Sequence, residues 1–433
     1  MIQMAWSRTA LAAWVLLAAS GCATLGPRPV GPEDIPSLQD RAAQDPEDGE
    51  VHFLLGAALA AADRCDEAVV SARRGRAIQP ADATGPLIIG ECLESAGDYE
   101  EALNLYAQFL FEHGDTPGAQ AVEGRRVIAL QLQARGMARA AVENEANLGA
   151  AEPETVGVLP FIVDGDPAYE SLSVGLAHML TTDLALLRRF PLVERVQLDA
   201  LLQEMELAPE LMDPATAART GRLMRASRMI LGTVSVPSGA RAQLGGNIVL
   251  ETGELVEPLT MEGELENILS MEKDFALQIA ENLGYQLSEA ERQRILENQP
   301  GSLMAFLAFS RGLEAEGMGD YEAAATFYNE ALVADPQYGE AQAKLRGATG
   351  VEMGQAQIAG LTYVPEAMPP TAVDFNAMAN TLASSVLDVA SHQSERATLG
   401  AGSSSTSIDV LIGDNEILPL LEAVITIIIT IPR

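Results

Sequence analysis

The stretch Val156-Gly157-Val158-Leu159-Pro160-Phe161-Ile162-Val163 decides how the middle of this chain folds. It is a short apolar run rich in β-branched residues, which is typical of a buried strand. Working outward, the pattern predicts further strands at 190–195, 229–236, 242–251 and 254–262, and helices at 172–187, 196–207, 213–225 and 267–283. Asp213-Pro214 supplies an N-cap and a first-turn proline for the third of these helices. Because strands alternate with helices until a final hairpin at Thr252-Gly253, we predict a mixed, partly parallel sheet.

Five short motifs occur in order along this region. They are Val158-Leu159-Pro160-Phe161, Leu180-Thr181-Thr182-Asp183-Leu184, Val193-Glu194-Arg195 with Leu198, Asp213-Pro214-Ala215-Thr216-Ala217 and Ile230-Leu231-Gly232-Thr233-Val234. Together they resemble the curli-secretion lipoprotein (CsgG-like) family. The resemblance spans about 155 to 295, and we assign 155–297 to a CsgG-like α/β domain. It implies a periplasmic scaffold that can oligomerise, as in the family's curli pore and its holdfast-anchoring and flagellar-associated lipoproteins.

One feature of the family's pore formers is missing from this sequence. Those members insert two long amphipathic hairpins into the membrane, and each such strand needs ~9–11 alternating residues. The hairpin around Gly253 carries Glu251, Glu254, Glu257, Glu262 and Glu264, which would be costly on a surface facing lipid. We therefore expect no pore, and keep a pore-forming curli-type export component as the alternative function.

A repeated pattern precedes the middle domain. Gly56 recurs as Gly90, and Ala68 recurs as Ala102, each after one period of about 34 residues. Small residues at these positions let paired helices approach closely, and the pattern resembles the tetratricopeptide (TPR) repeat. The family's pattern falls on Leu55, Leu59 and Pro80 in the first copy and on Ile89, Leu93, Gly97 and Tyr106 in the second. We assign 45–150 to TPR-like helical repeats.

A third copy lies downstream of the middle domain. Gly312 and Ala324 have the same spacing as Gly56 and Ala68, and Tyr328, Ala331 and Pro336 complete the pattern. The alternative interpretation is a generic helical hairpin. We assign 301–347 to a single TPR-like hairpin that must pack on a neighbour, since stacked repeats need about three units for stability. The expected fold class is thus multidomain α plus α/β, with TPR-like hairpins flanking a mixed-sheet CsgG-like domain.

The first 22 residues have the form of a secretory signal. Arg8 precedes an apolar run from 10 to 19 that is too short to span a bilayer, and Ala19-Ser20-Gly21 leads into Cys22. This ending resembles the lipobox of bacterial lipoproteins, which implies that residues 1–21 are removed and that Cys22 carries acyl chains such as palmitate. Ala23 at the next position implies an outer-membrane address. The alternative is an ordinary cleaved signal with a chance cysteine.

Composition narrows the possible partners. The net charge of −34 disfavours nucleic acid and anionic lipid head groups as partners. Once Cys22 is acylated, Cys65 and Cys92 remain, and a periplasmic address permits a disulfide. Adjacent TPR helices run antiparallel, which would bring these two cysteines onto neighbouring turns. The alternative is a pair of buried free thiols.

We nominate no catalytic, cofactor-binding or metal-binding residue. Asp164, Asp166 and Asp183 lie at or after the first strand, where turn and capping roles explain them. The four histidines, His52, His113, His178 and His392, are scattered and have no obvious partners. The sequence contains no Gly-x-Ser-x-Gly elbow and no His-Glu-x-x-His motif.

Proline-rich residues at 22–44 are assigned to a linker, and 348–433 to a tail. The tail contains a Gly/Ser linker at 400–407 and a β-branched segment, Ile425-Thr426-Ile427-Ile428-Ile429-Thr430-Ile431, that favours a strand. Together these features predict a non-enzymatic lipoprotein anchored to the periplasmic face of the outer membrane. Its expected role is a scaffold or assembly factor for an envelope or secretion complex, with other envelope proteins as partners and possible homo-oligomers.

Overall fold

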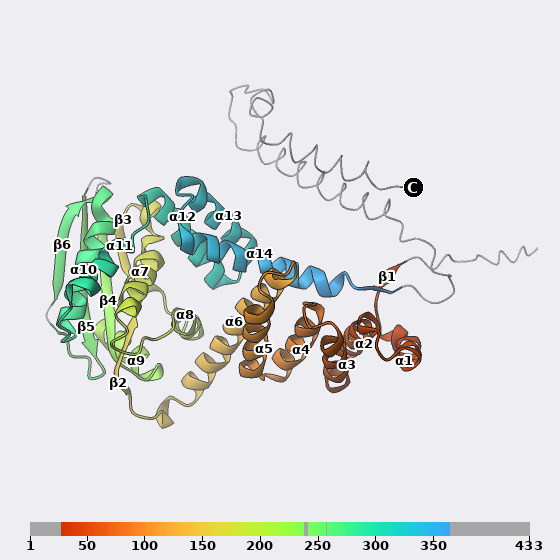
Figure 1. The fold of residues 1–433 in the computed structure, drawn as a ribbon. Helices are drawn as coiled ribbons and strands as arrows, with labels where there is room; N and C mark the ends of the chain where they lie inside the picture. The colour runs from red at the N-terminus through yellow and green to blue at the C-terminus, as the bar shows by residue number, and fades with distance from the viewer. Residues whose placement is uncertain (1–26, 238–240, 257, 364–433) are drawn as a thin grey trace, which may run out of the picture. The chain divides into compact units, whose positions relative to one another are not determined.

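A computed structural model describes residues 27–237, 241–256 and 258–363 of the 433-residue chain (Figure 1). The signal peptide, Cys22, the Gly/Ser linker and the β-branched segment at 425–431 lie outside the described residues. Among the residues it does describe, no helix is long and apolar enough to cross a membrane.

Antiparallel helical hairpins open the described chain. Each helix packs on the next, and fully buried small residues such as Ala68 and Ala102 lie where the paired helices meet. This agrees with the repeat period, since small side chains permit close approach. The helices are α1 (Ile35–Gln44), α2 (Gly49–Ala61), α3 (Cys65–Ile78), α4 (Thr84–Ala96), α5 (Tyr99–His113) and α6 (Ala119–Glu143).

Helix α1 corrects the assignment of residues 22–44 to a linker. It lies inside that range, and its Leu38 is fully buried against the first hairpin. Pro36 stands in its first turn, where a missing N–H costs nothing because that group has no partner within the helix. Pro36, one of the prolines in the stretch assigned to a linker, therefore lies at the start of a helix.

A mixed sheet forms the centre of the α/β domain. Strands β2 (Glu152–Val158) and β3 (Ile162–Gly165) both run parallel to β4 (Ala226–Val236). Strand β5 (Arg241–Leu250) pairs antiparallel with β4, and β6 (Leu259–Glu264) pairs antiparallel with β5. The order is β2-β4-β5-β6, with β3 also beside β4. The predicted mixed sheet is confirmed.

The strand predicted at 190–195 is reduced to a single bridge between Leu192 and Val156. Pro191 has no N–H to donate, and a helix begins at Arg195, so the chain has no room for a longer ladder. The prediction of a full strand there is wrong.

Helices cover both faces of the sheet. On one face α7 (Leu172–Leu187) and α10 (Ile268–Asn282) close the main core, where Phe161 and Phe275 meet edge to face with ring centroids 6.0 Å apart. On the other face α8 (Arg195–Glu204) and α9 (Pro214–Leu223) pack on a smaller cluster. Asp213 caps α9 as predicted, since its carboxylate accepts a hydrogen bond from the backbone N–H of Thr216 at 2.7 Å.

Helix α11 (Glu289–Glu297) packs on α7 and α10 and completes the α/β domain. The helices after the domain rejoin the first repeats, and they are α12 (Leu303–Met318), α13 (Tyr321–Ala334) and α14 (Gly339–Ala359). Helix α14 packs on α13 and also antiparallel along α6, with Gly354 beside Ala121 and Gly350 beside Gly124. A Cβ at Gly124 would lie 2.0 Å from the backbone of Gly350, so only glycine fits there.

The α6–α14 contact corrects the division of the flanks into separate units. The two sets of hairpins form one stack, ordered α2 to α6, then α14, α13 and α12, and the α/β domain is inserted between α6 and α12. Residues 348–359, assigned to the tail, belong to α14. Beyond it β7 (Thr362–Tyr363) pairs antiparallel with β1 (Arg28–Pro29), where Tyr363 lies opposite Arg28.

Candidate functional site: a polar cavity where the α/β domain meets the helical stack

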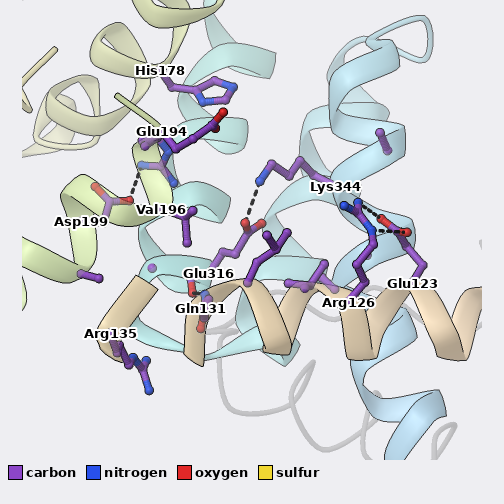
Figure 2. Close-up of a pocket in the computed structure, with 18 of the residues that line it drawn as sticks. Glu123, Arg126, Gln131, Arg135, His178, Glu194, Val196, Asp199, Glu316 and Lys344 are labelled. Atoms are coloured by element: carbon purple, nitrogen blue, oxygen red, sulfur yellow. Dashed lines mark hydrogen bonds and ion pairs between the residues drawn. The ribbon is translucent and has the colours of Figure 1, made fainter. Parts of the chain in front are cut away.

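A cavity of about 430 Å³ lies where the inserted domain meets the stack (Figure 2). Helices α6, α12 and α14 form the side belonging to the stack, while α8 and His178 of α7 form the side belonging to the α/β domain. Its lining is rich in charge and contains both signs. The charged lining residues, with His178 counted among them, are Glu123, Arg126, Arg135, His178, Glu194, Arg195, Asp199, Glu316, Glu340 and Lys344.

Most of these charges are paired inside the cavity. Lys344 Nζ lies 2.6 Å from Glu316 Oε1, and Arg195 lies 3.0 Å from Asp199. The imidazole of His178, on the α/β domain, contacts the carboxylate of Glu340 on α14. This last pair crosses between domain and stack, so its two residues help to hold the domain in place.

Two carboxyl groups of the cavity are held in the ionised form. Burial by itself raises the pKa of Glu316, but Lys344 and the hydroxyl of Tyr328 outweigh it and leave this pKa below its ordinary value. Burial likewise raises the pKa of Glu340, and His178 with Lys344 brings it below its ordinary value. Both groups therefore act as fixed negative partners at neutral pH.

Side-chain amides complete the joint. Gln131 on α6 donates to the backbone oxygen of Glu316 at 2.8 Å, and Gln203 on α8 donates to that of Gly317 at 2.9 Å. The last carbonyls of a helix lack their full set of helical partners. The Glu316 oxygen accepts from the N–H of Gly319 at 3.0 Å, and the two amides add hydrogen bonds to it and to the Gly317 oxygen. No serine, threonine or cysteine lines this cavity in the described chain, so it offers no hydroxyl or thiol nucleophile. Its geometry suits a fixed joint between domain and stack.

The core of the α/β domain contains a second charged group. Lys273 Nζ on α10 lies 2.5 Å from Asp183 Oδ2 on α7, and Asn298 donates to the other oxygen at 2.7 Å. Glu272 lies 3.1 Å from the same Nζ, without hydrogen-bond geometry. All three ionisable side chains are almost completely buried. Burial, with the nearby charge of Asp183, raises the pKa of Glu272 well above its ordinary value and favours its protonated form.

A repeated polar trio stabilises two hairpins of the stack. Tyr106 donates to Glu94 at 2.6 Å and Arg125 donates to the same carboxylate at 2.5 Å. The last hairpin has the same arrangement, in which Tyr328 donates to Glu316 at 2.7 Å and Lys344 donates to it at 2.6 Å. In both trios the tyrosine follows the glutamate by 12 residues, and the cation comes from the next helix packed on the hairpin.

The remaining residues singled out from the sequence have structural positions. Cys65 and Cys92 form a disulfide between α3 and α4, with Cα atoms 5.3 Å apart. Asp166 caps a short turn by accepting from the N–H of Ala168, and Asp164 accepts from the hydroxyl of Ser235. Asp183, expected in a turn or cap, lies instead in the buried cluster.

The expectation that the histidines lack partners is wrong for those the structure describes. His178 contacts Glu340, His52 contacts the backbone oxygen of Pro46, and His113 lies 3.9 Å from Glu112. His392 is outside the described residues. Over the described ranges, no group of three or more His, Cys, Asp or Glu side chains comes together in a way that could hold a metal.

Sequence reasoning missed Lys273, Lys344, Glu94 and Glu316. A signal for each was present. Lysine occurs only twice in a chain that otherwise uses arginine, and both lysines form close ion pairs. Both glutamates lie one helical turn after a repeat glycine, Gly90 in one case and Gly312 in the other.

Residues 155–254 match the family model described as curli production assembly/transport component CsgG. The match falls on the strands and helices of the α/β domain and confirms the CsgG-like resemblance for this part of the chain. Helical hairpins flank it on both sides, as predicted. No curated protein matches the sequence.

Solved structures give remote similarities. The LpoB C-terminal domain from Escherichia coli is 19% identical, covers 30% of this chain and 97% of its own length, and has a TM-score of 0.22. The LpoB C-terminal domain from Salmonella enterica is 19% identical over 29% of this chain and 94% of its own, with a TM-score of 0.21. A tetratricopeptide repeat protein from Parabacteroides merdae is 13% identical over 73% of this chain and 91% of its own, with a TM-score of 0.21.

Proposed function

We propose that this protein is a scaffold of the cell envelope, anchored by lipid on Cys22 to the periplasmic face of the outer membrane. The observation that carries the proposal is the CsgG match at 155–254 inside one continuous stack of TPR-like helices. A rigid joint of ion pairs fixes the two parts together, which suits a protein that positions partners. Its partners are other envelope proteins, and it works by binding, without catalysis.

An open hollow beside α5 and α6 offers a place to capture such partners. Its volume is about 720 Å³, and the half-exposed side chain of Met137 lies on its rim with Tyr99. Met137 is a suitable position for a photo-crosslinking residue, because it faces the hollow without contributing to a buried core. Leu255, at the hairpin of the α/β domain, has a similar exposed fraction and serves as the matched control.

The test is photo-crosslinking in intact cells, followed by mass spectrometry of what is captured. We expect the probe at Met137 to give discrete envelope-protein adducts that the probe at Leu255 does not give. The same bands from both positions, or none from Met137, would argue against binding by the stack.

The anchor has its own test. We expect metabolic labelling with an alkyne fatty acid to mark the wild-type chain and to leave Cys22→Ala unlabelled, because acylation requires that thiol. Two or more acyl chains give stable anchoring, whereas one would be marginal. Equal labelling of the wild type and Cys22→Ala would contradict lipid attachment at Cys22. The scaffold role would then still be tested by the crosslinking experiment.

A further inference from the structure

Strand β6 is the outer strand of the sheet, and its far side is open (Figure 1). It pairs with β5 alone among the described strands, and none of the backbone hydrogen bonds that the structure records outside helices and strands involves 259–264. The opposite edge is partly closed, because Val156 exchanges hydrogen bonds with Pro191 and Val193 at 3.0 and 2.9 Å. Within the described chain, β6 is therefore the edge that can accept another strand.

A groove of about 420 Å³ runs beside this edge, between β6 and α10. Met261 of β6 and Met271 and Leu277 of α10 form the apolar side of the groove. The exposed fractions of Met271 and Leu277 are small, 9% and 8%. Successive residues of a strand point to opposite faces. A strand added to β6 would thus direct every second side chain along this groove.

The other face of β6 is charged. Thr260, Glu262 and Glu264 alternate with the residues that face α10, and all three are exposed. Glu262 also lines the edge of the groove, so it lies between the two faces that an added strand would contact. Glu264 lies 4.0 Å from Arg241, which offsets one of the two negative charges. Asp274 and Glu281 on the groove rim add negative charge, of which Glu281 is paired with Arg292.

This charge argues against a second copy of the same edge as the occupant. Two β6 strands side by side would bring glutamates near one another, and like charges on neighbouring strands are destabilising. A basic strand would instead place lysine or arginine beside these glutamates, and opposite charges on neighbouring strands are stabilising. The net charge of −34 also attracts basic partners at long range.

We propose that the β6 edge binds an extended segment of a partner protein in which apolar residues alternate with lysine or arginine. The apolar side chains lie in the groove along Met261 and Met271, the basic ones face Glu262 and Glu264, and backbone hydrogen bonds continue the sheet. This inference deepens the proposed scaffold by naming the chemistry of one partner, and it rests on that proposal.

The test uses the full processed protein and a blocked eight-residue peptide that alternates lysine with isoleucine and valine. Binding is followed by fluorescence polarisation, and hydrogen exchange of 259–264 is measured with and without the peptide. We expect saturable binding and slower exchange of the β6 amides, since strand addition occupies their free side. Binding without slower exchange would overturn the proposal.

Two further peptides separate strand addition from simple charge attraction. One is N-methylated at its odd residues and the other at its even residues, so each lacks the N–H donors of one edge while keeping all side chains. We expect one of the two to lose binding. Equal binding of both, at the strength of the parent peptide, would overturn strand addition.

Matched protein variants locate the site. Glu262→Lys with Glu264→Lys should weaken binding about tenfold, the effect of two cross-strand ion pairs. Glu251→Lys with Glu254→Lys makes the same charge change at the far end of the hairpin and should bind like wild type. An equal loss in both would overturn the β6 site. Because crosslinking at Met137 reports on another surface, the scaffold and the β6 site can fail independently.

Discussion

The first and last hairpins of the helical stack are held together in different ways. In the last hairpin, Gly312 on α12 makes room for the ring of Tyr328, whose hydroxyl reaches Glu316 and, through it, Lys344. In the first hairpin, Ala72 occupies the position equivalent to Tyr328, and the two helices meet through small side chains and backbone. No polar trio bridges this first pair in the described chain. A disulfide ties it to the next hairpin instead.

This difference teaches that one residue in the repeat determines what kind of contact stabilises it. A tyrosine at this position buries a hydroxyl, which requires an acceptor and then a cation to balance the acceptor's charge. An alanine there buries no polar group and requires neither. The second hairpin follows the tyrosine pattern, with Gly90, Tyr106, Glu94 and Arg125.

The largest expected effect comes from removing the covalent tie. Cys65→Ser with Cys92→Ser should lower the free energy of unfolding by about 3 kcal/mol, because the bridge closes a loop between residues 27 apart. Urea unfolding followed by circular dichroism measures this. Unreduced tryptic peptides of periplasmic protein supply the control. Two freely alkylated cysteines in the wild type would show that the pair is not bridged in the cell.

Adding one methyl group at the two glycines should have different effects. Gly312→Ala should destabilise by about 1–3 kcal/mol, since its Cβ would lie 2.4 Å from the Tyr328 ring. Gly56→Ala places its Cβ 3.3 Å from the nearest backbone oxygen, and the higher helix propensity of alanine should offset that contact. The measurement is the urea midpoint of each variant. Equal losses at both positions would remove the distinction between the hairpins.

Deleting the hydroxyl of Tyr328 tests the polar trio directly. Tyr328→Phe keeps the ring and leaves Glu316 with one donor fewer, so we expect a loss of about 1 kcal/mol. Tyr106→Phe should cost a similar amount, because Glu94 loses the same donor. Thermal unfolding of the two variants compares them. No change in either would mean that the hydroxyls are only packed beside the glutamates.

The smallest expected effect is a difference in how the contributions of the two trios to stability change with pH. The pKa of Glu316 lies below its ordinary value, so its contribution to stability is present above the pKa of the unfolded chain and is lost as pH falls through the folded value. Burial raises the pKa of Glu94 more than Tyr106 and Arg125 lower it, so its contribution is present at low pH and is lost as pH rises.

Urea midpoints of Glu316→Gln and Glu94→Gln between pH 3 and 8 would show this difference. Glutamine resembles the protonated acid, so the first variant should be less stable than the wild type at neutral pH and approach it at acidic pH. The second should match the wild type at acidic pH and become the more stable of the two as pH rises. If the urea midpoints of the two variants changed with pH in the same way relative to the wild type, the two glutamates would have pKa values shifted in the same direction.

Local patterns in the sequence predicted the local structure well. The helix at 172–187 has the bounds expected from its spacing, and Asp213 caps the helix that it was expected to cap. Periodicity and capping act over a few residues and can therefore be read from one short stretch. The hairpins flanking the α/β domain were also predicted, because the repeat period is a local property that recurs along the chain.

Contacts between distant segments could not be predicted in the same way. The pairing of α6 with α14 joins Gly124 to Gly350, and nothing near either residue specifies the other. Asp183 was expected in a turn or cap, because its neighbours in the sequence do not identify its partner. That partner, Lys273, lies 90 residues away. The polar cavity depends on the packing of α6 against α14 and on the contact of His178 with Glu340, 162 residues away. Its residues therefore come together only once the stack is assembled.

The short pairing of β1 with β7 has a mechanical consequence. It places Arg28 opposite Tyr363, so the two ends of the described chain leave from one point. A force that pulled those ends apart would act first on this pair, whose few hydrogen bonds lie along the direction of separation and break one after another. Until they opened, the helices and the sheet between them would bear no tension. The described chain is thus a closed loop under load, and the pair of strands is the element that yields first.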